Sequence, residues 1–172
     1  MSLITKISVN KDIKSFKKDL INECTTNRIV DPTVNGANNY FLNSKHTENL
    51  YTMLIRICTK HLNTFTISDY NFKLWCYYSD DKFNTGNWHN HINTATINAV
   101  LYLKVPKNNR GIDFRHNQTI YNYKPKSGDL IIFPDFLDHY PYPSFHKPRI
   151  SLNLELKCNE HSREIFKLSN SC

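Results

Sequence analysis

The hydrophobic pattern of this 172-residue chain changes its period near residue 70, and this change limits the folds open to the chain. Before residue 70, apolar residues recur every three or four positions, as they do on the buried face of an amphipathic helix. That spacing predicts helices over 11–24 and 47–62, separated by an Asn-, Pro- and Gly-rich loop over 27–43. After residue 70, short β-branched and aromatic segments alternate with turn residues, which predicts strands. The expected strands are Phe72–Tyr78, Thr96–Val105, Ile112–Phe114, Thr119–Tyr123, Leu130–Phe133 and Arg149–Leu156.

Helices followed by many short strands predict an α+β protein with helices packed outside a small β-sandwich or barrel. We expect one domain over residues 1–172, with a helical part over about 1–70, a β core over about 71–158 and a short C-terminal tail. Hydrophobic residues make up 40% of the chain and aromatic residues 13%. This composition supplies a hydrophobic core and argues against a disordered chain.

Charge and cysteine content narrow the expected partners and the expected compartment. The chain has 22 Lys and Arg against 15 Asp and Glu, a net charge of +7. The basic residues are spread along the chain, so we expect a solvated basic surface, and a nucleic-acid partner is an alternative that is not favoured.

The expected compartment follows from the apolar segments and the cysteines. No apolar run reaches the roughly 18 residues of a membrane span, and residues 1–18 lack the apolar segment of a secretory signal. The five cysteines fit reduced thiols. We therefore expect a cytoplasmic protein without a membrane partner; the sequence does not indicate its oligomeric state.

A metal site is indicated by the segment Trp88-His89-Asn90-His91. In an extended segment, side chains at positions i and i+2 point the same way, so His89 and His91 can reach one ion. His139 is the expected third ligand, because it follows an apolar strand and a turn that would return the chain over the sheet. Imidazole ligands suit iron, copper, nickel and zinc.

The last expected strand is polar on one face and apolar on the other. Its polar face carries Arg149, Ser151, Asn153 and Glu155, and its apolar face carries isoleucine and leucines. If the polar face turns inward, Arg149 and Ser151 line a cavity. A buried guanidinium needs an anion, and its planar fork suits a carboxylate.

These motifs, in this order, resemble those of the 2-oxoglutarate- and Fe(II)-dependent oxygenase superfamily. Within it the chain looks most like small oxygenases of marine bacteria and phages that carry an H-x-H motif. The resemblance covers about residues 72–156 and implies a double-stranded β-helix, the jelly-roll or cupin-like fold. The segments that carry it are Trp75, Gly86, His89-x-His91, Tyr102–Pro106, Gly128–Pro134, His139 and Arg149-Ile150-Ser151.

The resemblance also implies a role for individual residues. His89 and His139 would be iron ligands, and Arg149 would pair with the distal carboxylate of 2-oxoglutarate, assisted by Ser151 and Tyr102. The cofactors would be Fe(II) and 2-oxoglutarate. The reaction would couple oxidative decarboxylation of 2-oxoglutarate to succinate with hydroxylation of a second substrate by O₂. That substrate, a small molecule or a protein side chain, is not identified by the sequence.

One position departs from the superfamily pattern. His91 stands where the superfamily has an Asp or Glu ligand. We expect His91 to be the third metal ligand, which makes the site one charge unit more positive. The alternative is that Asp113 or another carboxylate completes the ligand set and His91 lies beside it.

Two other classes of function compete with the oxygenase. Gly128, Pro134 and His139 also fit the second cupin motif, although Phe136 replaces its inner glycine, so a metal-dependent cupin enzyme that does not use 2-oxoglutarate is one alternative. The other is a non-catalytic β-sandwich that binds a partner. A structural zinc site is disfavoured, because such sites are rich in cysteine and no cysteine lies near the histidines in the sequence.

Overall fold

Nine strands and four helices make up the regular structure of the residues that the computed structural model describes, which are 3–26, 28–32, 38–62, 70–79, 86–144, 147–158 and 162–166. No helix in these ranges is long and apolar enough to cross a membrane. In chain order the elements are β1 (Thr5–Ser8), α1 (Asn10–Ile13), α2 (Lys17–Thr26), β2 (Asn39–Phe41), α3 (Thr47–Leu62), β3 (Tyr70–Ser79), β4 (Ile97–Lys104), β5 (Ile112–His116), β6 (Thr119–Tyr123), β7 (Asp129–Pro134), β8 (Asp138–Pro141), β9 (Arg149–Cys158) and α4 (Ser162–Ile165).

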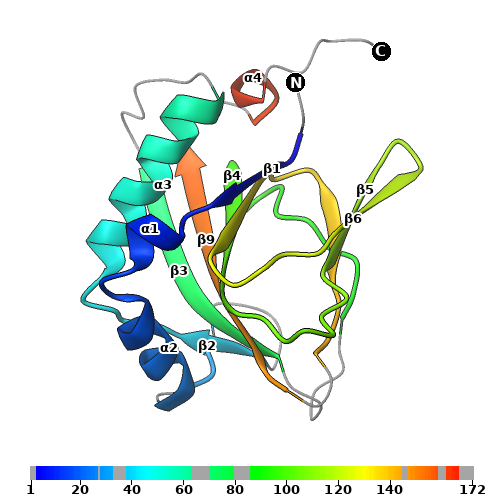
Figure 1. Ribbon diagram of the computed structural model, residues 1–172. Coiled ribbons are helices and arrows are strands. Elements are labelled where there is room, and N and C mark those ends of the chain that lie inside the picture. Colours follow the sequence, from blue (N-terminus) through cyan, green and yellow to red (C-terminus); the bar gives the residue numbers. More distant parts are fainter. Residues whose placement is uncertain are drawn as a thin grey trace.

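The strands form two antiparallel sheets. The larger sheet has the order β1-β7-β4-β9-β3-β2, and the smaller sheet has the order β6-β5-β8. Helices α1, α2 and α3 lie on one side of the larger sheet, and the β5–β6 hairpin projects from the other side of the molecule (Figure 1). This arrangement confirms the predicted α+β architecture, with the N-terminal helices packed outside a two-sheet core.

The larger hydrophobic core lies between the helices and the larger sheet. Helix α3 contributes a continuous apolar stripe that includes Leu50, Leu54 and Ile57, and each of these side chains is buried. A smaller apolar cluster, which includes Phe114 and Phe133, lies between the two sheets. Because most of the apolar packing is on the helix side, the space between the sheets can contain polar side chains.

Strand β9 lies at the centre of the larger sheet, between β4 and β3. Its apolar side chains, from Ile150 to Leu156, belong to the core on the helix side. The alternating polar side chains therefore face the space between the sheets. This is the orientation in which the sequence analysis expected Arg149 and Ser151 to line a cavity. Arg149, at 1% exposure, and Ser151, at 2%, are both fully buried.

Several elements differ from the sequence-based expectation. The helix predicted over 11–24 is interrupted, because the chain turns after Ile13 and the amide of Phe16 donates to the Ile13 carbonyl. The apolar spacing continues across that turn, which is why the pattern predicted one helix. The predicted loop over 27–43 contains the edge strand β2, and its residues 27 and 33–37 lie outside the described residues. Strands β1 and β8 were also not predicted, because each has four residues and mixes polar with apolar side chains.

The turn before β5 depends on Gly111. This residue has φ of +90°, and a Cβ there would lie 1.9 Å from the carbonyl oxygen of Tyr123. The Gly111 carbonyl also accepts a hydrogen bond of 3.1 Å from the amide of Tyr142. Both the backbone conformation and the neighbouring backbone therefore exclude a side chain.

We predict that Gly111→Ala lowers the free energy of unfolding by about 3 kcal/mol, from backbone strain and steric clash together. Urea denaturation followed by circular dichroism measures this change. Asn108→Ala, at an exposed position in the same turn, is the control and should stay within about 0.5 kcal/mol of the wild type. Equal stability of the two variants would contradict the prediction.

Candidate metal centre and anion pocket

The H-x-H segment is held against strand β8 by backbone pairing. His89 and His139 form an isolated antiparallel bridge, in which the His89 amide donates to the His139 carbonyl at 3.1 Å and the His139 amide donates back at 2.9 Å. Directly paired residues of antiparallel strands point their side chains to the same side. Two histidines that are 50 positions apart in the sequence are therefore neighbours for a reason of backbone geometry.

Side-chain and backbone contacts fix the rest of the segment. The Asn90 amide group donates to Asp138 at 2.9 Å, and Asp138 also accepts a hydrogen bond of 2.8 Å from Arg115. These two hydrogen bonds lower the pKa of Asp138, so its carboxylate stays charged. The His91 amide donates to the carbonyl of Asp135 at 2.8 Å. The segment is thus anchored at each of its three residues.

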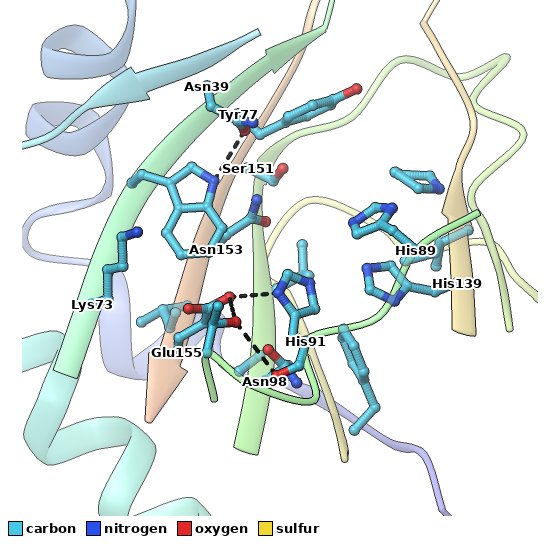
Figure 2. Close-up of a pocket in the computed structure, with 18 of the residues that line it drawn as sticks. Asn39, Lys73, Tyr77, His89, His91, Asn98, His139, Ser151, Asn153 and Glu155 are labelled. Atoms are coloured by element: carbon cyan, nitrogen blue, oxygen red, sulfur yellow. Dashed lines mark hydrogen bonds and ion pairs between the residues drawn. The ribbon is translucent and has the colours of Figure 1, made fainter. Parts of the chain in front are cut away.

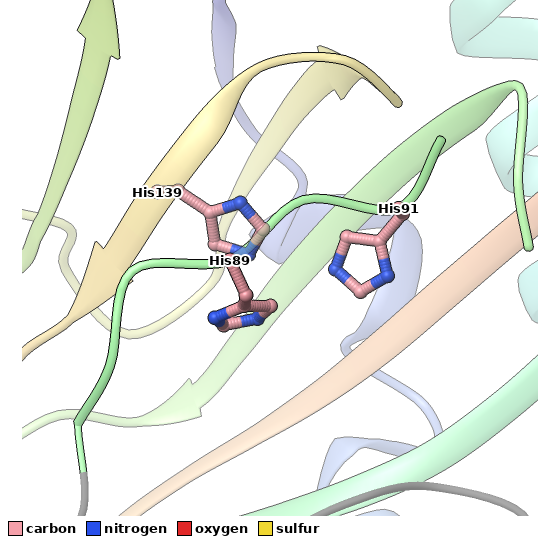
Figure 3. Close-up of side chains that lie close together, drawn as sticks. All are labelled: His89, His91 and His139. Carbon is pink, nitrogen blue, oxygen red and sulfur yellow. The ribbon is translucent and has the colours of Figure 1, made fainter. Parts of the chain in front are cut away.

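The imidazole rings of His89, His91 and His139 form one cluster (Figure 3). Their ring centroids are 4.1 Å apart for His89 and His139, 5.3 Å for His89 and His91, and 5.1 Å for His91 and His139. Each ring offers one nitrogen within 4.8 Å of the nitrogens of the other two. An ion with metal–nitrogen bonds of about 2.1 Å would need small side-chain rotations to bind all three nitrogens.

Hydrogen bonds determine which ring nitrogen of His89 and of His139 is free. The Nδ1 atom of His89 lies 3.0 Å from the carbonyl oxygen of Asn87, and the Nδ1 atom of His139 lies 3.2 Å from that of Leu137. A carbonyl oxygen only accepts hydrogen bonds, so each Nδ1 must carry the proton. The Nε2 lone pair of each ring is therefore available to a metal ion.

The Nδ1 atom of His91 is also engaged, but its partner is a carboxylate and not a backbone carbonyl. Its Nδ1 atom lies 2.6 Å from a carboxylate oxygen of Glu155 on β9 (Figure 2). A carboxylate that accepts from Nδ1–H leaves Nε2 of His91 free as well. All three imidazoles thus have Nδ1 engaged by an acceptor, which is the usual arrangement of histidines that bind a metal through Nε2.

The environment keeps two of these imidazoles neutral. Burial, followed by the nearby His89 and His91, lowers the pKa of His139 well below its ordinary value. Burial also lowers the pKa of His89, with a smaller contribution from His91. A neutral imidazole offers a lone pair, so the donor set fits a divalent metal ion.

Asp113, the alternative ligand considered from the sequence, is not brought to the cluster. In the register between β5 and β8, Phe114 pairs with His139, so Asp113 points to the opposite face of the strand. One of its oxygens accepts from Asn122 at 2.6 Å, and the other accepts from the Tyr142 hydroxyl at 2.7 Å. Within the described ranges, His89, His91 and His139 alone form a candidate ligand group.

A cavity of about 360 Å³ opens between the two sheets beside this cluster. Figure 2 shows side chains of β3 and β9 on one wall and His89 and His139 on the opposite wall. Arg149, Ser151 and Tyr102 also line the cavity. The structure therefore brings all six of the site residues predicted from the sequence to one cavity.

Arg149 is a buried cation without an anionic partner among the described residues. One terminal nitrogen donates to the carbonyl of Tyr142 at 2.7 Å, and to Gly111 and Asn109 at 3.4 Å each. The Nε atom is buried and has no hydrogen-bond partner, and no described carboxylate pairs with the guanidinium. An uncompensated buried charge is costly, so this end of the cavity fits an anion.

Ser151, Tyr102 and Tyr77 carry hydroxyl groups and line the cavity together with the guanidinium. Ser151 pairs with Tyr102 on β4 and with Tyr77 on β3, so these three side chains form one row across the sheet. The guanidinium lies over the Tyr77 ring, 5.4 Å from its centroid. Burial raises the pKa of Tyr102 to about 12, so its phenol stays protonated and is a hydrogen-bond donor. We call Arg149, Ser151, Tyr102 and Tyr77 the anion pocket.

Comparison with known proteins supports the fold. Neither protein-family models nor curated proteins give a significant match. Solved structures do match. An oxidoreductase of the 2OG-Fe(II) oxygenase family from Burkholderia pseudomallei has a TM-score of 0.67 and 12% identity, and the match covers 90% of this chain and 85% of that one. A prolyl-4-hydroxylase from Pseudomonas putida has a TM-score of 0.64, 13% identity and coverages of 92% and 94%, and the viral collagen prolyl hydroxylase of Paramecium bursaria Chlorella virus-1 has a TM-score of 0.62, 14% identity and coverages of 92% and 91%.

These likenesses establish the class of fold. The chain is a double-stranded β-helix of the kind found in 2-oxoglutarate- and Fe(II)-dependent oxygenases, as the sequence motifs predicted. At 12–14% identity the comparison shows the fold and not the reaction. The closeness to bacterial and phage proteins stays a prediction.

The sequence analysis did not assign Glu155 or Tyr77 to the site. The signal for Glu155 was present, because it shares the polar face of the last strand with Arg149 and Ser151. Its contact with His91 spans 64 positions and follows from strand pairing that spacing alone does not give. Tyr77 had no signal, since aromatic residues occupy much of its strand.

We predict that the metal-free protein loses stability as the pH falls below about 6.5, the ordinary pKa of histidine. Because the folded-state pKa values of His139 and His89 are lowered, the unfolded chain binds more protons in this range. The stability that the two neutral imidazoles contribute is fully present above their pKa in the unfolded chain. It is lost as the pH falls toward their lowered pKa in the folded protein. Urea denaturation between pH 7.5 and 5 should therefore show a flatter profile for His139→Gln than for the wild type.

His61→Gln is the matched control, because His61 lies exposed on α3. Its pH profile should run parallel to that of the wild type. If His139→Gln keeps the wild-type slope, the buried imidazole is not the source of the pH dependence.

Proposed function

We propose that this protein is an Fe(II)- and 2-oxoglutarate-dependent dioxygenase that hydroxylates a second substrate, a small molecule or a protein side chain. The observation that carries the proposal is one cavity with two complementary ends. At one end, three imidazoles present free Nε2 atoms. At the other end, a buried guanidinium lacks an anionic partner among the described residues. A ligand with a metal-chelating group and a remote carboxylate, such as 2-oxoglutarate, matches both ends.

In this proposal His89, His91 and His139 hold the iron. When bound, Fe(II) with 2-oxoglutarate supplies O₂ activation, coupled to the conversion of 2-oxoglutarate to succinate and CO₂. The protein orients the three imidazoles through the acceptors at Nδ1. The Phe133 ring, whose centroid lies 4.8 Å from that of His139, covers one side of the cluster.

The anion pocket binds the distal carboxylate of 2-oxoglutarate. Arg149 donates charge-assisted hydrogen bonds, and the hydroxyl groups of Ser151 and Tyr102 add donors from the neighbouring strands. The Tyr142 carbonyl holds one terminal nitrogen of the guanidinium at 2.7 Å. The Arg149 guanidinium is thus oriented before the ligand binds, which reduces the entropy lost on binding.

The anion pocket also separates this proposal from its alternatives. A cupin enzyme that does not use 2-oxoglutarate has no need of a buried arginine beside its metal that lacks an anionic partner among the described residues. A non-catalytic binding module has no need of three oriented imidazoles. The dioxygenase accounts for both features at once.

We predict that anaerobic addition of Fe(II) and 2-oxoglutarate gives the visible charge-transfer band of the chelated iron. His139→Ala should abolish the band, because one of the three nitrogen donors is lost. His61→Ala, at an exposed position, should leave the band intact. Metal binding without a band would favour the cupin, and the absence of metal binding would favour the binding module.

A second prediction concerns Arg149. Arg149→Met keeps an apolar stem but removes the charged fork, and should weaken 2-oxoglutarate binding to the iron-loaded protein by roughly 10- to 100-fold. Fe(II) binding in the absence of 2-oxoglutarate should be unchanged. Titration of the visible band with 2-oxoglutarate gives the dissociation constant, and an unchanged constant would remove Arg149 from the binding site.

A further inference from the structure

The three candidate ligands differ in what they bind through Nδ1. His89 and His139 donate to neutral backbone carbonyls at 3.0 and 3.2 Å. His91 instead contacts the Glu155 carboxylate at 2.6 Å, the shortest of the three distances. His91 stands at the position where the oxygenase superfamily has a carboxylate ligand. It is also the one histidine of the three whose Nδ1 contacts a carboxylate.

The contact is buried. The Glu155 side chain is 6% exposed and the His91 side chain is 17% exposed. Water screens such a pair weakly, so the carboxylate and the imidazole interact more strongly than an exposed pair. An ionised carboxylate in this position requires hydrogen-bond donors, and the Nδ1–H of His91 supplies one.

The fold places Glu155 with little freedom. It lies on the central strand β9, where it pairs with Lys73 on β3 and with Asn98 on β4. The Thr94 hydroxyl, three residues after His91, donates to the same carboxylate oxygen at 3.4 Å. Glu155 is thus fixed by the sheet and contacts the segment that carries the H-x-H motif.

We propose that Glu155 is the positioning residue of the metal centre. It holds His91 with its proton on Nδ1 and Nε2 toward the metal. Through its hydrogen bond to the imidazole, Glu155 also supplies negative charge beside a ligand set of three histidines that has none of its own. This inference rests on the proposed metal site and extends it to a residue outside the ligand set.

The chemistry of imidazole supports this role. A carboxylate that accepts the Nδ1 proton fixes the tautomer and the ring orientation and makes Nε2 a stronger donor. Direct coordination by Glu155 is a different arrangement, and the ligand group in the described part of the chain does not include it. Variants that keep or remove the hydrogen bond distinguish the two.

The first experiment is an anaerobic calorimetric titration of the protein with Fe(II) alone, at fixed pH. Glu155→Ala removes both charge and acceptor, and should bind Fe(II) 10- to 100-fold more weakly than the wild type. Glu155→Gln keeps an amide oxygen that accepts from Nδ1–H but removes the charge, so its affinity should lie between the two. Asp113→Asn is the matched control, because Asp113 is also buried but lies outside the histidine cluster, and its affinity should equal that of the wild type.

The second experiment reads the tautomer directly in the metal-free protein. Long-range ¹H–¹⁵N spectra of the histidine rings should show the wild-type His91 protonated at Nδ1. In Glu155→Ala, His91 should populate both tautomers, while His89 and His139 keep Nδ1–H. A general loss of structure would disturb all three rings, so this pattern is specific to the positioning role.

Three results would overturn the inference. Wild-type Fe(II) affinity in Glu155→Ala would show that the carboxylate does not support the site. Equal losses in Glu155→Gln and Glu155→Ala would indicate direct coordination, and an unchanged His91 tautomer in Glu155→Ala would show that another group orients the ring. Failure of the wild type to bind Fe(II) is a different outcome, because it would remove the proposed function itself.

Discussion

The burial of opposite kinds of side chain on the two faces of strand β9 is the constraint on which the rest of the structure depends. One face contributes Ile150 and the leucines to the core beneath the helices. The other face carries Arg149 and Glu155 into the space between the sheets, where unpaired charges are costly. Glu155 contacts His91, whereas Arg149 has no anionic partner in the described part of the chain. The strand is stable because its apolar face is fully packed, and its polar face is then available for binding.

The division of the apolar core follows from the same constraint. Helices α1–α3 cover the outer face of the larger sheet, and most of the buried apolar side chains lie there. The sandwich interior needs only the smaller cluster around Phe114 and Phe133. Its remaining volume forms the cavity, which is lined by strand residues and by the segment before β4 that carries His89 and His91. The side chains of the anion pocket are held on the paired strands β3, β9 and β4, so they lose little entropy when a ligand binds.

The two anchoring points are oriented by different kinds of contact. The imidazoles of His89 and His139 are oriented by backbone carbonyls close to them in sequence. His91 depends on a carboxylate from a distant strand, and Arg149 on the Tyr142 carbonyl. The proposed metal end is therefore coupled through Glu155 to the same strand that carries the proposed anion end. Strand β9 thus contributes a side chain to each end of the cavity.

The sequence by itself determined the change from helices to strands, the H-x-H segment and the alternation of polar and apolar side chains along the last strand. These features depend on local periodicity and on one-residue alternation, which a linear pattern contains. Only the tertiary structure decided the pairing of His89 with His139, the exclusion of Asp113 from the cluster and the contact between His91 and Glu155. The edge strands β1, β2 and β8 belong to this second group, because three or four residues carry too little periodicity to predict a strand. Strand register is set by pairing between distant segments, and a shift of one residue would reverse which side chains face the cavity.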